Sequence, residues 1–194
     1  MKNLIALIIL FTSFTLAADL PTLKIGEAVP SFSLKNYDGK EFSLTKLNKE
    51  NKFTVLMFIS TECPVSNSYN EKMVKLSETY LSKGIQFVGI NANKEEMVED
   101  IAKHSKEHKF KFPVLKDEKN KIADLYGALV TPEVYVVSKE GKLLYHGRID
   151  DARMKTEAKS HDLQDALDAL LAGKEILQKE TNAKGCSIKR IAME

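Results

Sequence analysis

The chain is poor in cysteine and has no tryptophan, and Cys63 and Cys186 are the only thiols among its 194 residues. A small domain held together by disulfides would need several more cysteines, so a disulfide-rich scaffold is excluded. The two thiols are therefore candidates for redox chemistry or for a single bridge.

Long apolar runs are missing beyond the N-terminus. Residues 4–16 are almost all apolar behind Lys2, and small residues follow them, a pattern typical of a secretory signal cleaved after Ala17 or Ala18. No later segment approaches the roughly 20 apolar residues that a membrane helix needs. We therefore expect a signal peptide at residues 1–18, no stable membrane insertion after cleavage, and a periplasmic or secreted protein. An uncleaved N-terminal anchor is the alternative.

Neither sign of charge is in large excess. The chain has 29 lysines and arginines against 27 acidic residues, a formal net charge of +2, and the two signs are interspersed. This balance provides no electrostatic footprint for nucleic acid or an anionic membrane. Without repeats or low-complexity segments, the length fits one domain. We expect that domain at residues 19–174, followed by a polar tail at residues 175–194 that carries Cys186.

The most informative stretch is residues 53–69, FTVLMFISTECPVSNSY. Its apolar run, residues 53–59, predicts a central strand buried on both faces, and a helical pattern follows from Pro64. Proline suits the first helical position, so Cys63 is expected at a helix N-terminus, where unpaired amides and the helix dipole favour a thiolate. A buried structural cysteine is the alternative, and an inward-pointing Glu62 would oppose the effect.

Strand and helix patterns alternate along the chain. Alternating apolar residues on both sides of Asp38-Gly39 predict a β-hairpin within residues 25–47. The other expected elements are a helix at 65–80, a strand at 85–90, a helix at 94–110 with Met97 and Ile101 inward, an extended segment at 112–115, a short helix near 122–126, antiparallel strands at 134–137 and 142–149, and a closing helix at 161–172. Such alternation implies right-handed crossovers and parallel neighbours. It brings Cys63 to the carboxyl end of a strand, where ligand sites of open α/β sheets collect.

The order of these elements resembles the thioredoxin fold. The segments IGEAVPSFSL, DGKEFSL, FISTECPVS, FVGINAN, FPVLKD and LVTPEVYVV are similar to those of redoxins of the alkyl hydroperoxide reductase and thiol-specific antioxidant family. YHGRIDD and GCSIK add a resemblance to its peroxiredoxin-like exported group. The resemblance implies an α/β, thioredoxin-like fold with a central mixed sheet, helices on both faces and an added N-terminal β-hairpin.

The resemblance also implies roles for individual residues. Cys63, followed by Pro64, matches the attacking cysteine, and Pro132 matches a proline held in cis beside it, where Thr131 backbone groups pair with a bound substrate strand. Thioredoxins carry a second cysteine three residues after the first, but this chain has Ser66 there. Dithiol exchange within the motif is therefore excluded.

Comparison with peroxiredoxins gives one match and one departure. They carry Thr or Ser three residues before the attacking cysteine, which Ser60 satisfies, and proline seven before it, where this chain has Leu56. They also hold the thiolate and the peroxide with an arginine. Arg148, at the end of the last strand, is the arginine that we expect near the site, and an ordinary surface arginine is the alternative.

A second thiol is needed to complete a redox cycle. Attack on a peroxide leaves a sulfenic acid and attack on a disulfide leaves a mixed disulfide, and each must be resolved. From Gly173 to Cys186 an extended chain covers ~43 Å, about the width of a domain of this size. Cys186 can therefore reach Cys63 in the same chain or across a homodimer. We expect a thiol-based oxidoreductase that acts on a peroxide or protein disulfide with an external thiol reductant and no cofactor.

A non-catalytic metal-binding module is the alternative function. His146 and His161, together with the two cysteines, would form a soft copper or zinc site, and exported thioredoxin-fold relatives include metal chaperones. The chain lacks the CxxxC pair of those proteins. His104 and His108 are four residues apart on an expected helix, a spacing that also suits a metal ion. Because both histidines also continue the edge of the Met97 and Ile101 stripe on a lysine-rich helix, no metal ligand is assigned.

Overall fold

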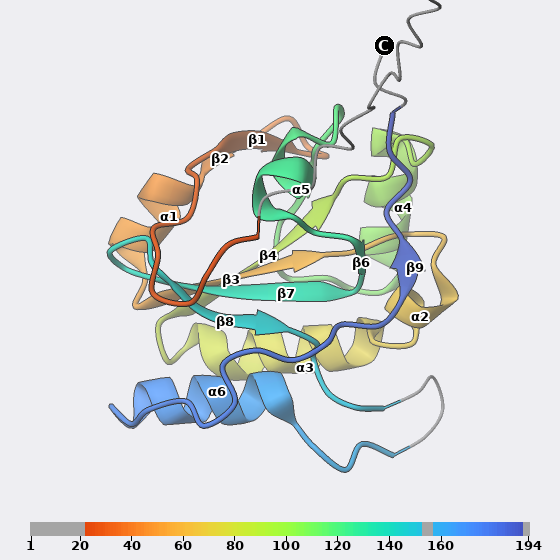
Figure 1. Cartoon of the computed structure of the whole chain (residues 1–194). Helices are drawn as coiled ribbons and strands as arrows, with labels where there is room; N and C mark the ends of the chain where they lie inside the picture. The colour runs from red at the N-terminus through yellow and green to blue at the C-terminus, as the bar shows by residue number, and fades with distance from the viewer. Residues whose placement is uncertain (1–21, 153–156, 192–194) are drawn as a thin grey trace, which may run out of the picture.

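The computed structural model describes residues 22–152 and 157–191, so the expected signal peptide lies outside the described residues. A seven-stranded sheet in the order β2-β1-β5-β4-β3-β7-β8 lies between helices (Figure 1). Its strands are β1 (Ser33–Asn36), β2 (Glu41–Ser43), β3 (Phe53–Phe58), β4 (Ile85–Asn91), β5 (Val114–Lys116), β7 (Glu133–Ser138) and β8 (Leu143–Gly147). The helices are α1 (Leu44–Glu50), α2 (Pro64–Asn67), α3 (Asn70–Leu81), α4 (Val98–Glu107), α5 (Lys121–Tyr126) and α6 (Asp162–Leu171).

The strand pairing confirms the predicted mixed sheet. β3 runs parallel to β4 and β4 parallel to β5, whereas β7 is antiparallel to both β3 and β8. The N-terminal hairpin β1-β2 joins the sheet where β1 runs antiparallel to β5. The carboxyl ends of β3 and β4 therefore lie side by side, and the segment that carries Cys63 begins there.

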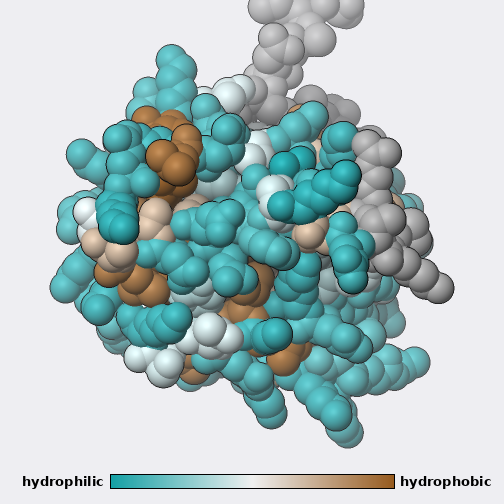
Figure 2. All heavy atoms as spheres, turned by 90° about the horizontal axis from the view of Figure 1, so that it is seen from below, coloured by the Kyte–Doolittle hydropathy of each residue, from teal (hydrophilic) through white to brown (hydrophobic). Residues whose placement is uncertain are grey.

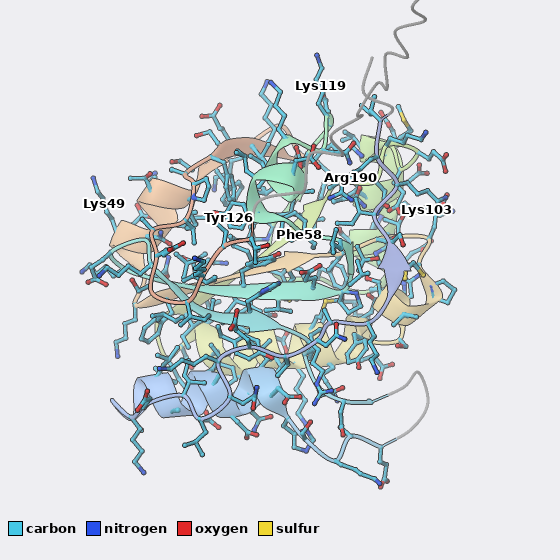
Figure 3. The ribbon with its side chains drawn as sticks, in the orientation of Figure 1. Lys49, Phe58, Lys103, Lys119, Tyr126 and Arg190 are labelled. Atoms are coloured by element: carbon cyan, nitrogen blue, oxygen red, sulfur yellow. The ribbon has the colours of Figure 1, made fainter. Side chains whose placement is uncertain are left out.

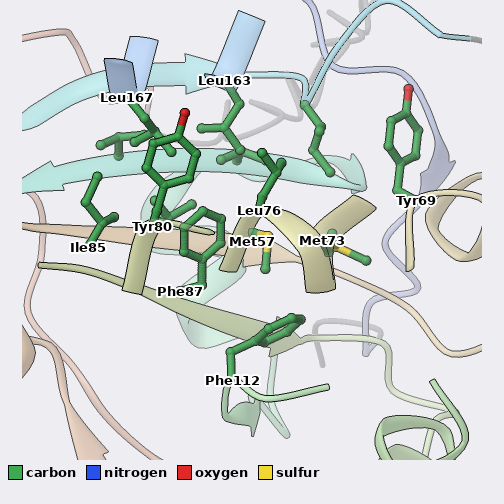
Figure 4. Packing of buried hydrophobic residues seen from close by; sticks show 14 of the residues in the cluster. Met57, Tyr69, Met73, Leu76, Tyr80, Ile85, Phe87, Phe112, Leu163 and Leu167 are labelled. Atoms are coloured by element: carbon green, nitrogen blue, oxygen red, sulfur yellow. The ribbon is translucent and has the colours of Figure 1, made fainter. Parts of the chain in front are cut away.

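The continuous apolar sequence of β3 follows from burial on both faces. Val55 and Met57 pack with α3 and α6, while Leu56 and Phe58 pack with α1 and α5. All four side chains are fully buried. Figure 4 shows the layer that includes Met57, where side chains of α3 and α6 cover the sheet. A strand covered in this way has no polar face to alternate with its apolar one.

Packing of α6 on the sheet gives a direct test of this core. Leu167 is completely buried in the α3 and α6 layer, whereas Leu177, just beyond the helix, is fully exposed. We expect Leu167→Ala to lower the free energy of unfolding by about 2–5 kcal/mol, because it removes buried methyl groups and leaves a cavity. Leu177→Ala is the matched control and should change stability little. Urea denaturation of the two variants measures both effects, and equal losses would contradict this assignment of the core.

The predicted start of the helix expected at residues 94–110 is wrong. α4 begins at Val98 rather than near residue 94, and Met97, expected to face inward, is 60% exposed. Glu96 is buried instead, and its carboxylate accepts hydrogen bonds from the turn after β3. The segment before Val98 therefore turns so that the Glu96 carboxylate is buried, and the helix begins only after this turn.

The single helix expected after Cys63 is divided into α2 and α3. The Tyr69 N–H donates to the carbonyl of Ser66, three residues back, and the Ser68 hydroxyl donates to the carbonyl of Val65. Such short-range bonds tighten a turn and interrupt the regular helical ladder. The interruption directs the Tyr69 hydroxyl to Asp150, 2.8 Å away.

Three further elements have no counterpart in the prediction. α1 follows the hairpin directly, and the polar C-terminal tail forms β9 (Cys186–Ser187), which pairs antiparallel with the equally unpredicted β6 (Val130–Thr131). In Figure 1 the tail runs from α6 past β8 to β6, and β9 lies beside α2. Burial of Ile176 and Ile188 fixes the tail against the domain.

The face shown in Figure 2 is largely hydrophilic, with small, separate hydrophobic areas. Among the helices of residues 22–152 and 157–191, none combines the length and the apolar character that a membrane crossing requires.

Candidate active site

Cys63 occupies the N-cap position of α2, as expected, with Pro64 as the first helical residue. The thiol is buried, with 4% of the residue exposed, and its sulfur accepts a hydrogen bond from the Ser66 N–H at 3.3 Å. Because α2 is only four residues long, the direct N–H contact matters more here than the dipole of a long helix. The local sequence thus places one amide donor on the sulfur.

The second cysteine lies against the first. β9 sets Cys186 opposite Thr131 in the β6 ladder, and the Thr131 carbonyl oxygen lies 3.3 Å from the Cys63 sulfur. Both cysteines are free. β9 therefore brings Cys186 next to the contact between Thr131 and Cys63 within one chain.

The two thiols have different acidities. Burial alone would raise the pKa of Cys63, but hydrogen bonds from the Cys186 thiol and from backbone N–H groups, including that of Ser66, outweigh it, and the net pKa lies below the usual thiol value. Burial and the neighbouring Cys63 raise the pKa of Cys186. Cys63 is therefore the thiol that ionises first, and Cys186 ionises at higher pH.

The segment before β7 forms the other wall of the site. The Thr131-Pro132 peptide bond is cis, as expected. The Thr131 carbonyl oxygen lies 3.3 Å from the Cys63 sulfur and accepts a hydrogen bond from the protonated thiol. Beside it is a hollow of about 630 Å³, lined in part by Tyr69, Pro132 and Gly185. Both cysteines thus meet next to a space large enough for a small molecule.

Ser60 and Ser66 hold the turn that carries Cys63. The Ser60 hydroxyl accepts the N–H of Cys63 at 2.9 Å and of Glu62 at 3.1 Å, while the Ser66 hydroxyl accepts the N–H of Ser60 at 3.2 Å. The Ser60 hydroxyl donates its own proton to Glu96 at 2.5 Å. The serine three residues before the cysteine therefore fixes the backbone of the turn rather than touching the sulfur.

Glu96 is the residue of this site that the sequence did not indicate. Its carboxylate, 2% exposed as a residue, also accepts hydrogen bonds from the Thr61 hydroxyl at 2.7 Å and the Asn91 side-chain amide at 2.6 Å. Glu96 thus joins the turn after β3 to the end of β4. It lies in the charged run NKEEMVED, where nothing distinguishes it from its neighbours.

The model of the AhpC/TSA family matches residues 25–146. The chain belongs to the AhpC/TSA family. It is similar to the thiol-disulfide oxidoreductase ResA of Bacillus cereus, with 29% identity over 127 residues, which is 66% of this chain and 71% of the relative. It is also similar to a chloroplastic peroxiredoxin Q of Populus jackii, with 32% identity over 132 residues, covering 63% of this chain and 60% of the relative.

Solved structures agree with this placement. A hypothetical protein of Sinorhizobium meliloti 1021 has a TM-score of 0.83 at 31% identity, covering 89% of this chain and 98% of that one. The thioredoxin domain of a thiol-disulfide oxidoreductase of Bacteroides vulgatus has a TM-score of 0.63 at 18% identity, covering 77% and 99% of the two chains, and supports the fold alone. This AhpC/TSA protein therefore has a thioredoxin-like fold and a thiol-based oxidoreductase function.

Two charged residues of this AhpC/TSA protein have their partners away from the sulfur. Arg148 forms an ion pair with Asp162 at 2.8 Å; it lines the hollow beside Pro132, and no described hydrogen bond joins it to Cys63. The side chain of Glu62 is 60% exposed and pairs with Lys189. The opposition of Glu62 to a thiolate is therefore weak, and the direct arginine contact expected from the resemblance is not among the described interactions.

Two of the four histidines considered as metal ligands have other contacts. His146 lies 2.7 Å from the buried Glu133 and stacks on Tyr135, and His104 lies 2.9 Å from the Asn67 side chain. Within residues 22–152 and 157–191, no group of three or more His, Cys, Asp or Glu side chains is placed to hold a metal ion. The family comparisons favour thiol chemistry over the metal-binding alternative.

Proposed function

We propose that Cys63 is the attacking thiol of an exported oxidoreductase and that Cys186 resolves its oxidised form within the same chain. The observation that carries this proposal is the position of Cys186 on β9, opposite the Thr131 residue whose carbonyl oxygen lies 3.3 Å from the Cys63 sulfur. Their unequal acidities support the assignment, since the thiol with the lower pKa is the nucleophile. Thr131 and Pro132 form the wall against which the sulfurs meet, and Ser60, Pro64 and Ser66 set the helix start.

The first step consumes either a hydroperoxide or a disulfide. With a hydroperoxide, the Cys63 sulfur bonds to the terminal oxygen, the O–O bond breaks, and the leaving alkoxide or hydroxide takes a proton from water. Cys63 is then a sulfenic acid. With a disulfide, Cys63 bonds to one sulfur, the other sulfur leaves as a thiolate, and a mixed disulfide remains.

Cys186 completes the oxidation in both cases. It loses its proton and attacks the Cys63 sulfur, which releases water from the sulfenic acid or the substrate thiol from the mixed disulfide. The product is a Cys63–Cys186 disulfide. An external thiol then attacks the Cys186 sulfur, which is the less buried of the two. Cys63 leaves as the more stable thiolate, and a second reductant thiol regenerates Cys186.

The apolar N-terminal pattern of residues 4–16 supports export to the periplasm or the exterior. An oxidising compartment suits a disulfide intermediate, while turnover still needs a thiol reductant as partner. Because the two thiols meet within one chain, a homodimer is not required for the chemistry.

Mass spectrometry after one equivalent of hydrogen peroxide, or of a small disulfide, tests the proposal. In the native protein we expect a peptide that joins Cys63 to Cys186 by a disulfide. In Cys186→Ser, oxidation should stop at a Cys63 sulfenic acid, which dimedone traps, or at a mixed disulfide on Cys63. The proposal fails when Cys63 stays reduced toward both oxidants while the same thiols oxidise in the denatured chain.

A further inference from the structure

The C-terminal tail pairs with the edge of β6, and this pairing places Cys186 near Cys63. Val130 lies opposite Ser187 and Thr131 opposite Cys186, and the ladder continues with a hydrogen bond from the Ile188 N–H to the Leu129 carbonyl at 2.9 Å. β9 is the only strand paired with β6 in the described part of the chain. Its position shows that a strand bound at this edge carries its cysteine to the reactive sulfur.

A strand edge accepts one partner at a time, because a bound strand already takes up the hydrogen bonds of the backbone N–H and carbonyl groups along that edge. Any polypeptide that presents a disulfide to Cys63 by strand addition needs the same β6 groups. It must therefore displace β9 first.

Close backbone contacts hold the tail in this place. A Cβ atom on Gly185 would lie 1.9 Å from the Thr131 carbonyl oxygen, so no side chain fits there. Upstream, Gly147 has a φ of +147° and its added Cβ would lie 2.1 Å from the Thr181 hydroxyl. Glycine at these two positions allows the tail to lie directly on β6 and on β8.

Hydrogen bonds fasten the tail on both sides of Cys186. Upstream, the His146 N–H donates to the Lys179 carbonyl at 3.0 Å. Downstream, the Lys189 N–H donates to the Asn93 side chain at 2.9 Å, and the Arg190 guanidinium, labelled in Figure 3, binds Asp124 at 2.8 Å. The segment that fills the β6 edge is therefore an integral part of the site.

We propose that β9 occupies the place of a substrate strand, so that Cys63 reacts poorly with polypeptide disulfides and readily with small oxidants. Gly185 is then the specificity-determining residue. Small oxidants do not need the β6 edge, because the hollow lined by Pro132 and Gly185 lies beside the two cysteines. The inference rests on the proposed role of Cys63 as the attacking thiol.

The test compares two probes on full-length variants that all carry Cys186→Ser, so that Cys63 is the only reacting thiol. One probe is a small aromatic disulfide, and the other is a short linear peptide whose single cysteine carries the same aromatic thiol as a mixed disulfide. Attack by Cys63 releases the coloured aromatic thiolate in both cases. Gly185→Val places a side chain where none fits against Thr131 and so pushes β9 away from β6, and Ser187→Val is the matched control at an exposed position of β9.

The readout is the rate with the peptide divided by the rate with the small disulfide, which cancels any change in the reactivity of Cys63 itself. We expect Gly185→Val to raise this ratio about tenfold or more and Ser187→Val to leave it within about twofold. An unchanged ratio in a folded Gly185→Val protein whose tail has lost hydrogen-exchange protection would overturn the inference.

A second variant covers the case in which Gly185→Val does not fold. Ile188→Ala with Arg190→Ala loosens the tail from its downstream contacts and should raise the same ratio. No rise, with exchange again showing a released tail, overturns the selectivity role. Failure of Cys63 to react with either probe in every variant is a different result, since it rejects the proposed function itself.

Discussion

Replacing Cys63 with serine is expected to lower turnover of hydrogen peroxide, or of a small disulfide, by about 10³-fold or more. The hydroxyl does not ionise near neutral pH, so neither a sulfenic acid nor a mixed disulfide forms at this position. Serine is a favourable N-cap residue, and it keeps an acceptor for the Ser66 N–H that now bonds to the sulfur. Steady-state assays with dithiothreitol as the reductant measure the loss.

Cys186→Ser separates the two thiols in the same assay. Because Cys186 acts only after the first step, this variant should keep a single oxidation of Cys63 and lose rapid turnover. Retention of more than about a tenth of the native turnover by Cys63→Ser would contradict the assignment of the nucleophile. Thermal unfolding of both variants confirms that the comparison concerns folded proteins.

The second large effect is expected at Glu96. Glu96→Ala removes the carboxylate that accepts hydrogen bonds from Ser60, Thr61 and Asn91, and leaves those buried donors without a partner. We expect the free energy of unfolding to fall by about 3–5 kcal/mol. Because Ser60 also holds the Cys63 N–H, alkylation of Cys63 in the folded variant should slow as well. Urea denaturation and the alkylation rate measure the two effects.

Two matched substitutions define the role of Glu96. Glu96→Gln keeps an acceptor oxygen and should recover part of the lost stability. Glu95→Ala removes the adjacent exposed carboxylate, which pairs with Lys189 at the surface, and should change stability little because exposed ion pairs contribute little. Equal losses in the Glu95 and Glu96 variants would show that the buried network is not the cause.

Local patterns were sufficient to predict the reactive turn and most of the sheet. The apolar run of β3 and the Cys63-Pro64 pair act through neighbouring residues, so the strand end, the N-cap and the first helical residue followed directly from the sequence. The hairpin at Asp38-Gly39 has a similarly local signal. The cis bond at Pro132 followed only from the family resemblance.

Contacts between distant segments could not be predicted in this way. The helical pattern favoured Met97 facing inward. The hydrogen bonds that Ser60 and Thr61 donate to Glu96 come from a turn 36 and 35 residues earlier in the chain, and they outweigh the burial of one methionine. β9 is two residues long, too short for an alternating pattern. Gly185, whose neighbour is Thr131 across the fold, was visible only as part of a family marker.

The pH dependence of alkylation, followed separately for Cys63 and Cys186 by mass spectrometry, tests whether Cys63 is the nucleophilic thiol. We expect Cys63 to remain reactive at pH values below the usual thiol pKa and to lose reactivity only as the pH falls through its lowered pKa, whereas Cys186 becomes reactive above the usual value. In Cys186→Ala the Cys63 profile should move to higher pH, because the thiol that donates to its sulfur is gone. Coincident profiles for the two cysteines, or a Cys186 that ionises before Cys63, would contradict the account.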